Sequence, residues 1–293
     1  MSKPILIDSL EQIVSAFDVV LLDQFGVLHD GSASYPSACE AMTRLHACGK
    51  EIFILSNSGK RSDLNLKRIE RLGLPGETIS GVVTSGEALW QDMRASRLRV
   101  ASREVKSLYP ICARPDDSRI WAAGGDIQIV DRIDSGCDAI LLMGLPDGTV
   151  ETDYDAVFQS ALEFEIPLIC SNPDKTSPRA DRLVMSPGML AARYQVKGGQ
   201  VIYYGKPHMP VFHAVMRYRS ELDASRFLMV GDSLEHDIAG GQKVGVKTAL
   251  VRGGIHQPNF ANLEREAEIE ATLFALSRKH DIAPPDFSLR YLT

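Results

Sequence analysis

Short apolar runs rich in Val, Ile and Leu recur along this chain and alternate with longer polar or amphipathic stretches. Buried parallel strands have nearly continuous apolar sequences, so this alternation predicts an α/β fold with a helix-covered parallel sheet. Strands are expected at 17–23, 51–57, 81–84, 97–102, 138–144, 166–172, 200–206, 226–232 and 246–251. Helices are expected in segments between them, at 37–47, 62–72, 209–220 and 236–244.

Composition excludes several classes of protein. The 293 residues, 44% apolar and 24% charged, are typical of a globular protein with room for two domains. The net charge of −6, without a block of Lys or Arg, argues against nucleic-acid or anionic-membrane binding. The five cysteines show no CxxC spacing and are expected to be reduced thiols. No apolar run reaches the roughly 18 residues of a membrane span, and no signal pattern is seen, so we expect a cytoplasmic protein.

Four of the apolar runs end at polar residues: Asp23, Ser56 with Asn57, Lys206, and Asp232. Ligands of open parallel sheets bind outside the carboxyl ends of the strands, so these residues are candidates to meet in one crevice. Residues 85–199 contain their own alternation of strands and helices between the second and third of these positions. They are predicted to form an inserted second domain.

The acidic residues at these strand ends suggest phosphoryl chemistry. A carboxylate at Asp23 could attack a phosphoryl group and form an acyl phosphate, although an Asp after a strand often only starts a turn. Asp232 and Asp237 could bind Mg²⁺, which prefers oxygen ligands. Asp237 could equally be a helix-start residue facing the helix dipole.

The other strand ends suggest anion binding. Lys206 could hold Asp23 and a phosphate together by charge pairing, or be a solvated surface lysine. Ser56 and Asn57 offer a hydroxyl and backbone amides at the start of a helix, which suits an anion. A helix cap or a turn is the alternative for this pair.

Taken together, the segments LLDQFGV (21–27), ILSNSGKR (54–61), GKPHMPVF (205–212) and MVGDSLEHD (229–237) resemble the four motifs of the haloacid dehalogenase superfamily. Further segments, VTSGEA (83–88), SNPD (171–174) and SPGML (186–190), look like its class IIA, NagD-like branch. The resemblance covers nearly the whole chain. It implies a Rossmann-like catalytic core of residues 1–84 and 200–293 with an inserted α/β cap of residues 85–199.

The resemblance also implies a role for each matching residue. Asp23 would be the nucleophile, and Mg²⁺ would be bound by Asp23, Asp232 and the backbone carbonyl of Phe25, with Asp237 acting through water. Ser56, Asn57 and Lys206 would bind the phosphoryl group. Asn172 and Asp174 match the branch's Asn-Pro-Asp element and would position the cap or contact the substrate.

One position departs from the family. Its phosphatases carry an acid/base Asp two residues after the nucleophile, and this chain has Phe25 there. The leading hypothesis is therefore a slow Mg²⁺-dependent hydrolase of a small phosphate monoester, similar to a sugar phosphate, that uses an aspartyl-phosphate intermediate. His29 or Asp30 is a candidate replacement for the acid.

Two alternatives remain open at this stage. The chain could bind metal and phosphate ligands with little turnover, or catalyse a related transfer that needs no leaving-group protonation. The expected partner is a small phosphorylated metabolite, with no nucleic acid and no membrane. The resemblance also allows a homodimer.

Overall fold

The computed structural model describes residues 3–179 and 182–293, which form two compact units. The first unit contains the chain up to Ser56, Asp63–Val83 and Phe212–Thr293. The second unit contains Asn57–Ser62 and Thr84–Val211. The assignment of residues 85–199 as a cap on a catalytic core of residues 1–84 and 200–293 stays a prediction.

The first unit is built on a sheet with the strand order β1-β16-β15-β14-β2-β3-β4. The strands are β1 (Ile5–Leu6), β16 (Phe287–Leu289), β15 (Lys247–Val251), β14 (Phe227–Gly231), β2 (Val19–Leu22), β3 (Glu51–Ser56) and β4 (Ile79–Thr84). The pairings from β1 through to β3 are parallel. Central strands β2 and β14 are entirely buried, which explains their uninterrupted apolar sequences.

The second unit has its own parallel sheet, in the order β13-β10-β9-β7-β8. Its strands are β13 (Val201–Tyr203), β10 (Leu168–Cys170), β9 (Ala139–Leu142), β7 (Ser107–Ile111) and β8 (Gln128–Ile129). Two antiparallel pairs accompany this sheet, β5 (Arg99–Val100) with β6 (Arg103–Glu104) and β11 (Thr176–Arg179) with β12 (Arg182–Met185). The predicted α/β fold class is therefore confirmed.

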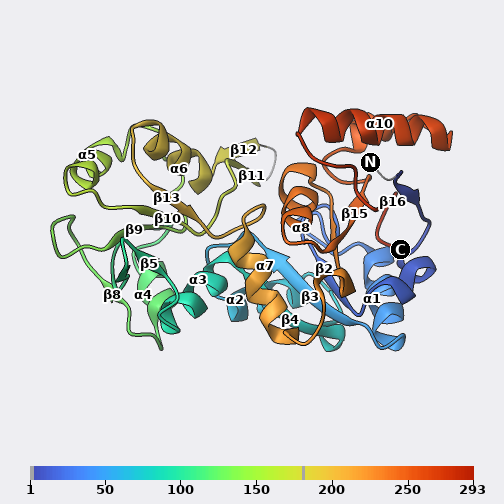
Figure 1. The fold of residues 1–293 in the computed structure, drawn as a ribbon, viewed down its shortest axis with the longest axis horizontal. Helices are drawn as coiled ribbons and strands as arrows, with labels where there is room; N and C mark the ends of the chain where they lie inside the picture. The colour runs from blue at the N-terminus through green and yellow to red at the C-terminus, as the bar shows by residue number, and fades with distance from the viewer. Residues whose placement is uncertain (1–2, 180–181) are drawn as a thin grey trace. The chain divides into compact units, whose positions relative to one another are not determined.

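Helices lie between the strands along the chain (Figure 1). They are α1 (Pro36–Ala47), α2 (Ser62–Arg71), α3 (Ser85–Arg94), α4 (Asp117–Ala122), α5 (Asp155–Glu163), α6 (Pro187–Val196), α7 (Met209–Met216), α8 (Ala239–Lys243), α9 (Gln257–Phe260) and α10 (Glu266–Lys279). Short 3₁₀ turns span Leu10–Ala16, Gly76–Thr78, Arg217–Arg219 and Ala224–Arg226, and a π-helical turn spans Leu234–Ile238. Within the described residues, no helix is long and apolar enough to cross a membrane.

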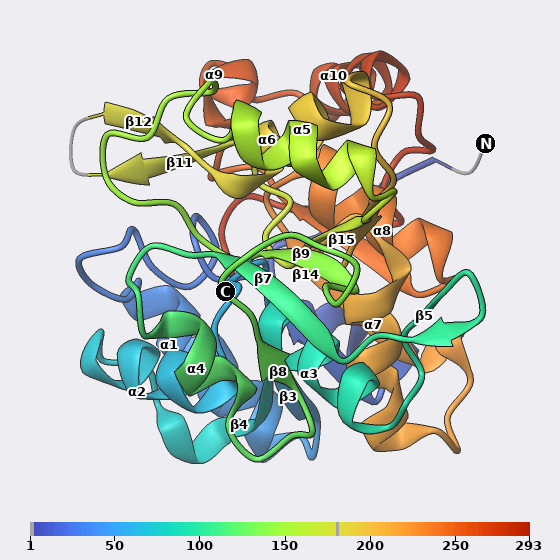
Figure 2. The ribbon, with the colours of Figure 1, turned by 90° about the vertical axis from the view of Figure 1, so that its left-hand side faces the viewer.

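Alternating residues of the strands build the core on the two faces of each sheet. In β15, Ala249 and Val251 join a cluster that includes residues of α1, whereas Leu250 packs with Leu273 of α10. In the second unit, α5 and α6 lie on one face of the sheet and α3 and α4 on the other (Figure 2). Phe158 of α5 and Tyr194 of α6 are fully buried there.

Two strand predictions differ from the structure, and the strand at 107–111 was not predicted. The run 200–206 was expected to belong to the same sheet as Asp23, but β13 pairs with β10 in the second unit. The run 97–102 forms only the short strand β5, paired with β6. Strand β7 was missed, because Pro110 and the partly polar sequence of 107–111 do not resemble a continuous apolar run.

Candidate active site

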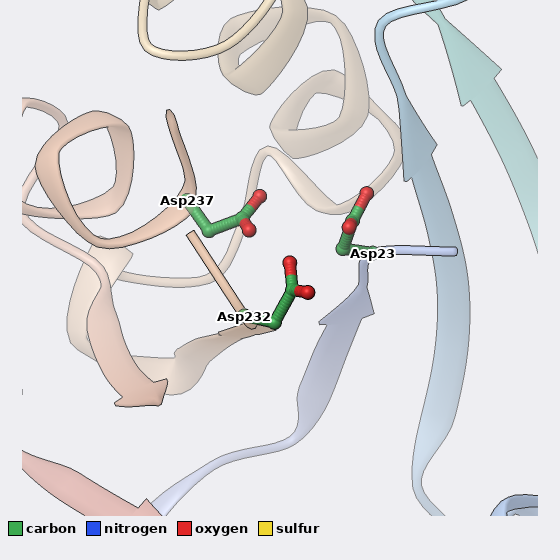
Figure 3. Close-up of side chains that lie close together, drawn as sticks. All are labelled: Asp23, Asp232 and Asp237. Carbon is green, nitrogen blue, oxygen red and sulfur yellow. The ribbon is translucent and has the colours of Figure 1, made fainter. Parts of the chain in front are cut away.

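Three carboxylates meet at one edge of the first unit's sheet. Oxygen atoms of Asp23, Asp232 and Asp237 all lie within 4.8 Å of one another (Figure 3). Asp23 follows β2 and Asp232 follows β14, and these parallel neighbours place Leu22 opposite Val230. Because parallel strands end at the same edge, this pairing brings the two carboxylates together.

The π-helical turn after β14 supplies the third carboxylate. Ser233 caps this turn, since its side chain accepts a hydrogen bond from the backbone N–H of His236 at 3.1 Å. The Ser233 N–H donates to Oδ2 of Asp237 at 3.1 Å, which orients that side chain. Gly231 is needed for the close approach, because a Cβ there would lie 2.1 Å from Cγ of Asp237.

Asp232 is packed between two glycines and a backbone donor. The N–H of Ile255 donates to its Oδ2 atom at 2.9 Å. A Cβ on either Gly26 or Gly254 would lie 2.1 Å from the same oxygen, so neither position has room for a side chain. Gly26 also has a φ of +80°, which L-residues rarely adopt. These backbone segments leave Asp232 only 3% exposed.

The donor set of this cluster fits a divalent cation that prefers oxygen ligands. Each carboxylate contributes an oxygen atom, and Asp232 and Asp237 are buried. Such a group of anions is costly without a nearby positive charge, because like charges repel strongly at short range. A bound divalent cation would offset this repulsion.

Ser56 lies at the same edge of the first unit's sheet. It is the last residue of β3, and β3 pairs with β2 so that Ile54 is opposite Leu22. Ser56 and Asp23 therefore both follow the paired ends of neighbouring strands.

Asn57, Asp174 and Lys206 come together in the second unit. The Asn57 Nδ2 group donates to Oδ1 of Asp174 at 2.8 Å and to the backbone carbonyl of Lys206 at 3.2 Å. The N–H of Lys206 donates to Oδ1 of Asn57 at 2.7 Å. Asn172 accepts a hydrogen bond from the N–H of Asp174 at 3.1 Å, which closes the turn of the Asn-Pro-Asp segment.

Phe25 lies in the loop after the proposed nucleophile. Its ring contacts the imidazole of His29 edge-on, with 6.1 Å between ring centroids, and remains 40% exposed. A Cβ on Gly31 would lie 3.1 Å from the ring. The apolar side chain at this position is thus held against the loop 25–31.

Asp30 is poorly suited to replace a missing acid. Its carboxylate accepts hydrogen bonds from the backbone N–H groups of Ala33 at 2.9 Å and Ser32 at 2.7 Å. These bonds favour the ionised form and lower the pKa of Asp30 below its usual range. An ionised carboxylate has no proton to donate near neutral pH.

His29 is a better candidate donor. Its Nδ1 atom accepts the N–H of Gly31 at 3.1 Å, which leaves the proton of a neutral ring on Nε2. Within the described residues, the buried Nε2 atom has no hydrogen-bond partner. Burial lowers the pKa of His29, and the charge of Arg68 acts in the same direction, so the ring is neutral at pH 7.

Sequence reasoning missed the contribution of the loop after β15. Gly254 and the N–H of Ile255 contact Asp232, although 22 and 23 residues separate them from it in the chain. The pair Gly253-Gly254, which follows the apolar run 246–251 after Arg252, was the available signal. It also missed the bond from Gln24 Nε2 to Oδ1 of Asn65 at 2.8 Å, which anchors the residue next to Asp23.

Two family models match the chain. A haloacid dehalogenase-like hydrolase model matches residues 20–124, and a HAD-hydrolase-like model matches residues 203–276. The chain is a haloacid dehalogenase-like hydrolase. The predicted membership in the superfamily and in its class IIA, NagD-like branch is confirmed.

Known proteins resemble the hydrolase over nearly its full length. Chronophin from Bos taurus is 28% identical over 282 residues, which cover 94% of this chain and 91% of chronophin. A haloacid dehalogenase-like hydrolase from Brucella suis 1330 has a TM-score of 0.78 and 25% identity, with 98% of this chain and 100% of that chain covered. A structure from Cytophaga hutchinsonii described as a possible sugar phosphatase shares the fold, with a TM-score of 0.74, 23% identity and 98% coverage of both chains.

Proposed function

We propose that this hydrolase is a phosphatase that cleaves a small phosphate monoester, similar to a sugar phosphate, with the help of Mg²⁺. The observation that carries the proposal is the meeting of Asp23 with Asp232 and Asp237 at the end of the β2 and β14 strands. The family matches over residues 20–124 and 203–276 support it. The sugar-phosphate character of the substrate is supported only by the fold shared with a possible sugar phosphatase.

In this proposal, Asp23 acts as the nucleophile and also as a metal ligand. Asp232 and the backbone carbonyl of Phe25 would be the other protein ligands of Mg²⁺, and Asp237 would act through water. Bound Mg²⁺ would supply charge neutralisation between the carboxylates and the phosphate dianion. Ser56 and Lys206 bind the transferring phosphoryl group, and Asn172 and Asp174 belong to the cap side of the substrate site.

The reaction proceeds in two displacements. A carboxylate oxygen of Asp23 attacks phosphorus, a P–O bond to Asp23 forms, and the P–O bond to the leaving group breaks. The departing alkoxide takes a proton from solvent. Water then attacks the phosphorus atom of the aspartyl phosphate and returns one proton to solvent. Cleavage of the bond to Asp23 releases inorganic phosphate and restores the carboxylate.

Phe25 limits the first displacement. It has no proton to give to the departing oxygen, and general acid–base help contributes about 10²–10⁴-fold in typical enzymes. The proposed enzyme is therefore slow with alkoxide leaving groups. A neutral His29, with its proton on Nε2, is the candidate for residual proton donation.

The apolar Phe25 also favours a second candidate function. A protein with the carboxylate cluster but without an acid would bind a metal and a phosphate ligand with little turnover. A transfer reaction whose leaving group needs no proton fits the same observation. Location in the cytoplasm and assembly as a homodimer stay predictions.

Replacement of Asp23 by Asn tests the proposal. The amide has nearly the same shape but is not nucleophilic, so turnover of phosphate monoesters should fall by more than about 10³-fold. Acid-quenched wild-type enzyme should carry one phosphoryl group on the peptide that contains Asp23, as measured by mass spectrometry. Unchanged turnover in Asp23→Asn would place the nucleophile elsewhere, and binding without turnover in the wild type would favour the second candidate.

A further inference from the structure

The Asn57 side chain makes hydrogen bonds to two segments far away in the sequence. Both of its Nδ2 hydrogens are used, one for Oδ1 of Asp174 at 2.8 Å and one for the carbonyl oxygen of Lys206 at 3.2 Å. Its Oδ1 atom accepts the Lys206 N–H at 2.7 Å. Asn57 is only 9% exposed, so these bonds are shielded from water.

These bonds leave the Asn57 side chain no N–H donor for a phosphate, whereas phosphate binding by the backbone amides of Ser56 and Asn57 stays a prediction. A phosphate dianion offers only acceptor oxygens, and an amide can bind it only through its two N–H donors. Both donors already have partners within the second unit. The remaining lone pair on Oδ1 would repel an anion.

The same bonds hold the backbone of Lys206 from both sides. The peptide N–H and the carbonyl of Lys206 each bond to Asn57, which fixes where the lysine side chain starts. The backbone at Gly205 is closely packed against its neighbours. A Cβ there would lie 2.3 Å from Cδ of Pro173 and 2.6 Å from Oδ1 of Asn57. Lys206 itself is 3% exposed.

We propose that Asn57 is a positioning residue that holds the backbone of Lys206 and ties it to Asp174. Asn57 directly follows Ser56. Ser56 and Lys206 are both predicted to bind the phosphoryl group, and Asn57 orients the backbone of Lys206. The inference rests on the proposed function, in which Lys206 binds the phosphoryl group. It assigns to the Asn57 side chain no contact with the substrate.

A set of four variants tests this role, with Lys206→Met as the reference for complete loss. Asn57→Ala removes all three hydrogen bonds. Asn57→Asp keeps an acceptor for the Lys206 N–H but loses the donor to the Lys206 carbonyl. It also places two carboxylates at the contact with Asp174, where a hydrogen bond of 2.8 Å stood. Asn57→Asp combined with Asp174→Asn restores a donor and an acceptor at that contact with the roles exchanged.

Thr248→Val is the matched control for the loss of buried hydrogen bonds. Oγ1 of Thr248 donates to Oδ2 of Asp286 at 3.0 Å in the first unit, and neither residue belongs to the proposed site. This variant should lower the melting temperature without changing kcat/KM or phosphate affinity. Comparison with this control distinguishes the effect of a general loss of stability from the effect of a misplaced Lys206 side chain.

Two measurements are made on each variant in the full chain with Mg²⁺. These are the affinity for inorganic phosphate by calorimetry, and kcat and KM for p-nitrophenyl phosphate. Misplacement of a charged group by about 1 Å can lower the rate about 10²-fold, so Asn57→Ala should lose about 10- to 100-fold in kcat/KM and bind phosphate more weakly. Asn57→Asp should lose more, and the double variant should recover at least about tenfold relative to Asn57→Asp.

The outcomes separate this inference from the proposed function. If the wild type binds phosphate without turnover, the phosphatase proposal fails and the phosphate affinities still test Asn57. Asn57→Ala with phosphate affinity and kcat/KM within twofold of the wild type, beside a defective Lys206→Met, would overturn the inference. A wild type that neither binds nor cleaves phosphate esters would overturn it as well.

Discussion

Phe25 occupies the position two residues after Asp23 where the resemblance to haloacid dehalogenase phosphatases implies an acid/base Asp. A leaving group with a low pKa, such as p-nitrophenolate, departs without a proton, whereas an alkoxide needs one. The wild type should therefore favour aryl over alkyl phosphates. The ring of Phe25 packs beside Gly31 and His29, so a smaller residue at this position leaves a void.

Replacement of Phe25 by Asp should raise alkyl-phosphate turnover more than aryl-phosphate turnover. We expect the ratio of kcat/KM for the two substrates to shift by about tenfold or more toward the alkyl ester, because a carboxyl group can protonate the alkoxide. The measurement compares one alkyl and one aryl phosphate in both proteins. Phe25→Ala is the control, since it creates the same void without an acid.

Ordinary alkyl-phosphate turnover in the wild type would contradict the role given to Phe25. Another group would then supply the proton, and His29→Ala would be the next variant to measure. Asp30→Asn should have little effect, because Asp30 is already ionised through its bonds to Ser32 and Ala33.

At the scale of secondary structure, the ends of β14 and β15 shape the carboxylate cluster together. Gly254 follows β15 and lies against Asp232, which follows β14. A Cβ at Gly254 would be 2.1 Å from Oδ2 and 2.3 Å from Cβ of Asp232. Either the loop or the carboxylate must move when a side chain is present.

Gly254→Ala should therefore impair the site with a modest loss of stability. Overpacking typically costs about 1–3 kcal/mol, and displacement of a ligand by about 1 Å can lower the rate about 10²-fold. We expect kcat/KM to fall at least about tenfold and a higher Mg²⁺ concentration to be needed for half-maximal activity. Gly136→Ala is the control, since its Cβ would meet only Oδ1 of Asp134 at 3.2 Å. Normal Mg²⁺ activation in Gly254→Ala would contradict the prediction and mean that the loop moves instead of Asp232.

At the scale of the whole molecule, metal binding should stabilise one unit more than the other. The proposed ligands Asp23 and Asp232 belong to the first unit, as does Asp237, which is proposed to act through water. A ligand that binds only the folded state stabilises it by about 2.7 kcal/mol at 100 times its Kd. Two compact units can also unfold in separate transitions.

Thermal unfolding in EDTA and in excess Mg²⁺ tests this expectation. Mg²⁺ should raise the melting temperature of the transition of the first unit by several degrees, and EDTA should reverse the shift and abolish turnover. Asp232→Asn should remove most of the shift, whereas Thr248→Val should retain it. A shift of equal size in Asp232→Asn, or full activity in EDTA, would exclude the carboxylate cluster as the metal site.

The amino-acid sequence by itself determined the fold class and the candidate residues of the first unit's site. Continuous apolar runs that end at Asp23 and Asp232 report local burial, and adjacent parallel strands carry such ends to one edge. The segments at these strand ends also indicated the haloacid dehalogenase superfamily, because the motifs of that superfamily lie at strand ends.

Only the tertiary structure decided which distant residues support these groups. Asn57 and Lys206 are 149 positions apart, and no local pattern indicates that one side chain holds the other's backbone. Strand β13, which precedes Lys206, pairs in parallel with β10 of the second unit. The sequence of its three apolar residues does not indicate this partner. Gly254 likewise contacts Asp232 only because β14 and β15 are neighbours in the sheet. Local sequence sets which segments are buried, whereas strand order sets which of their ends meet.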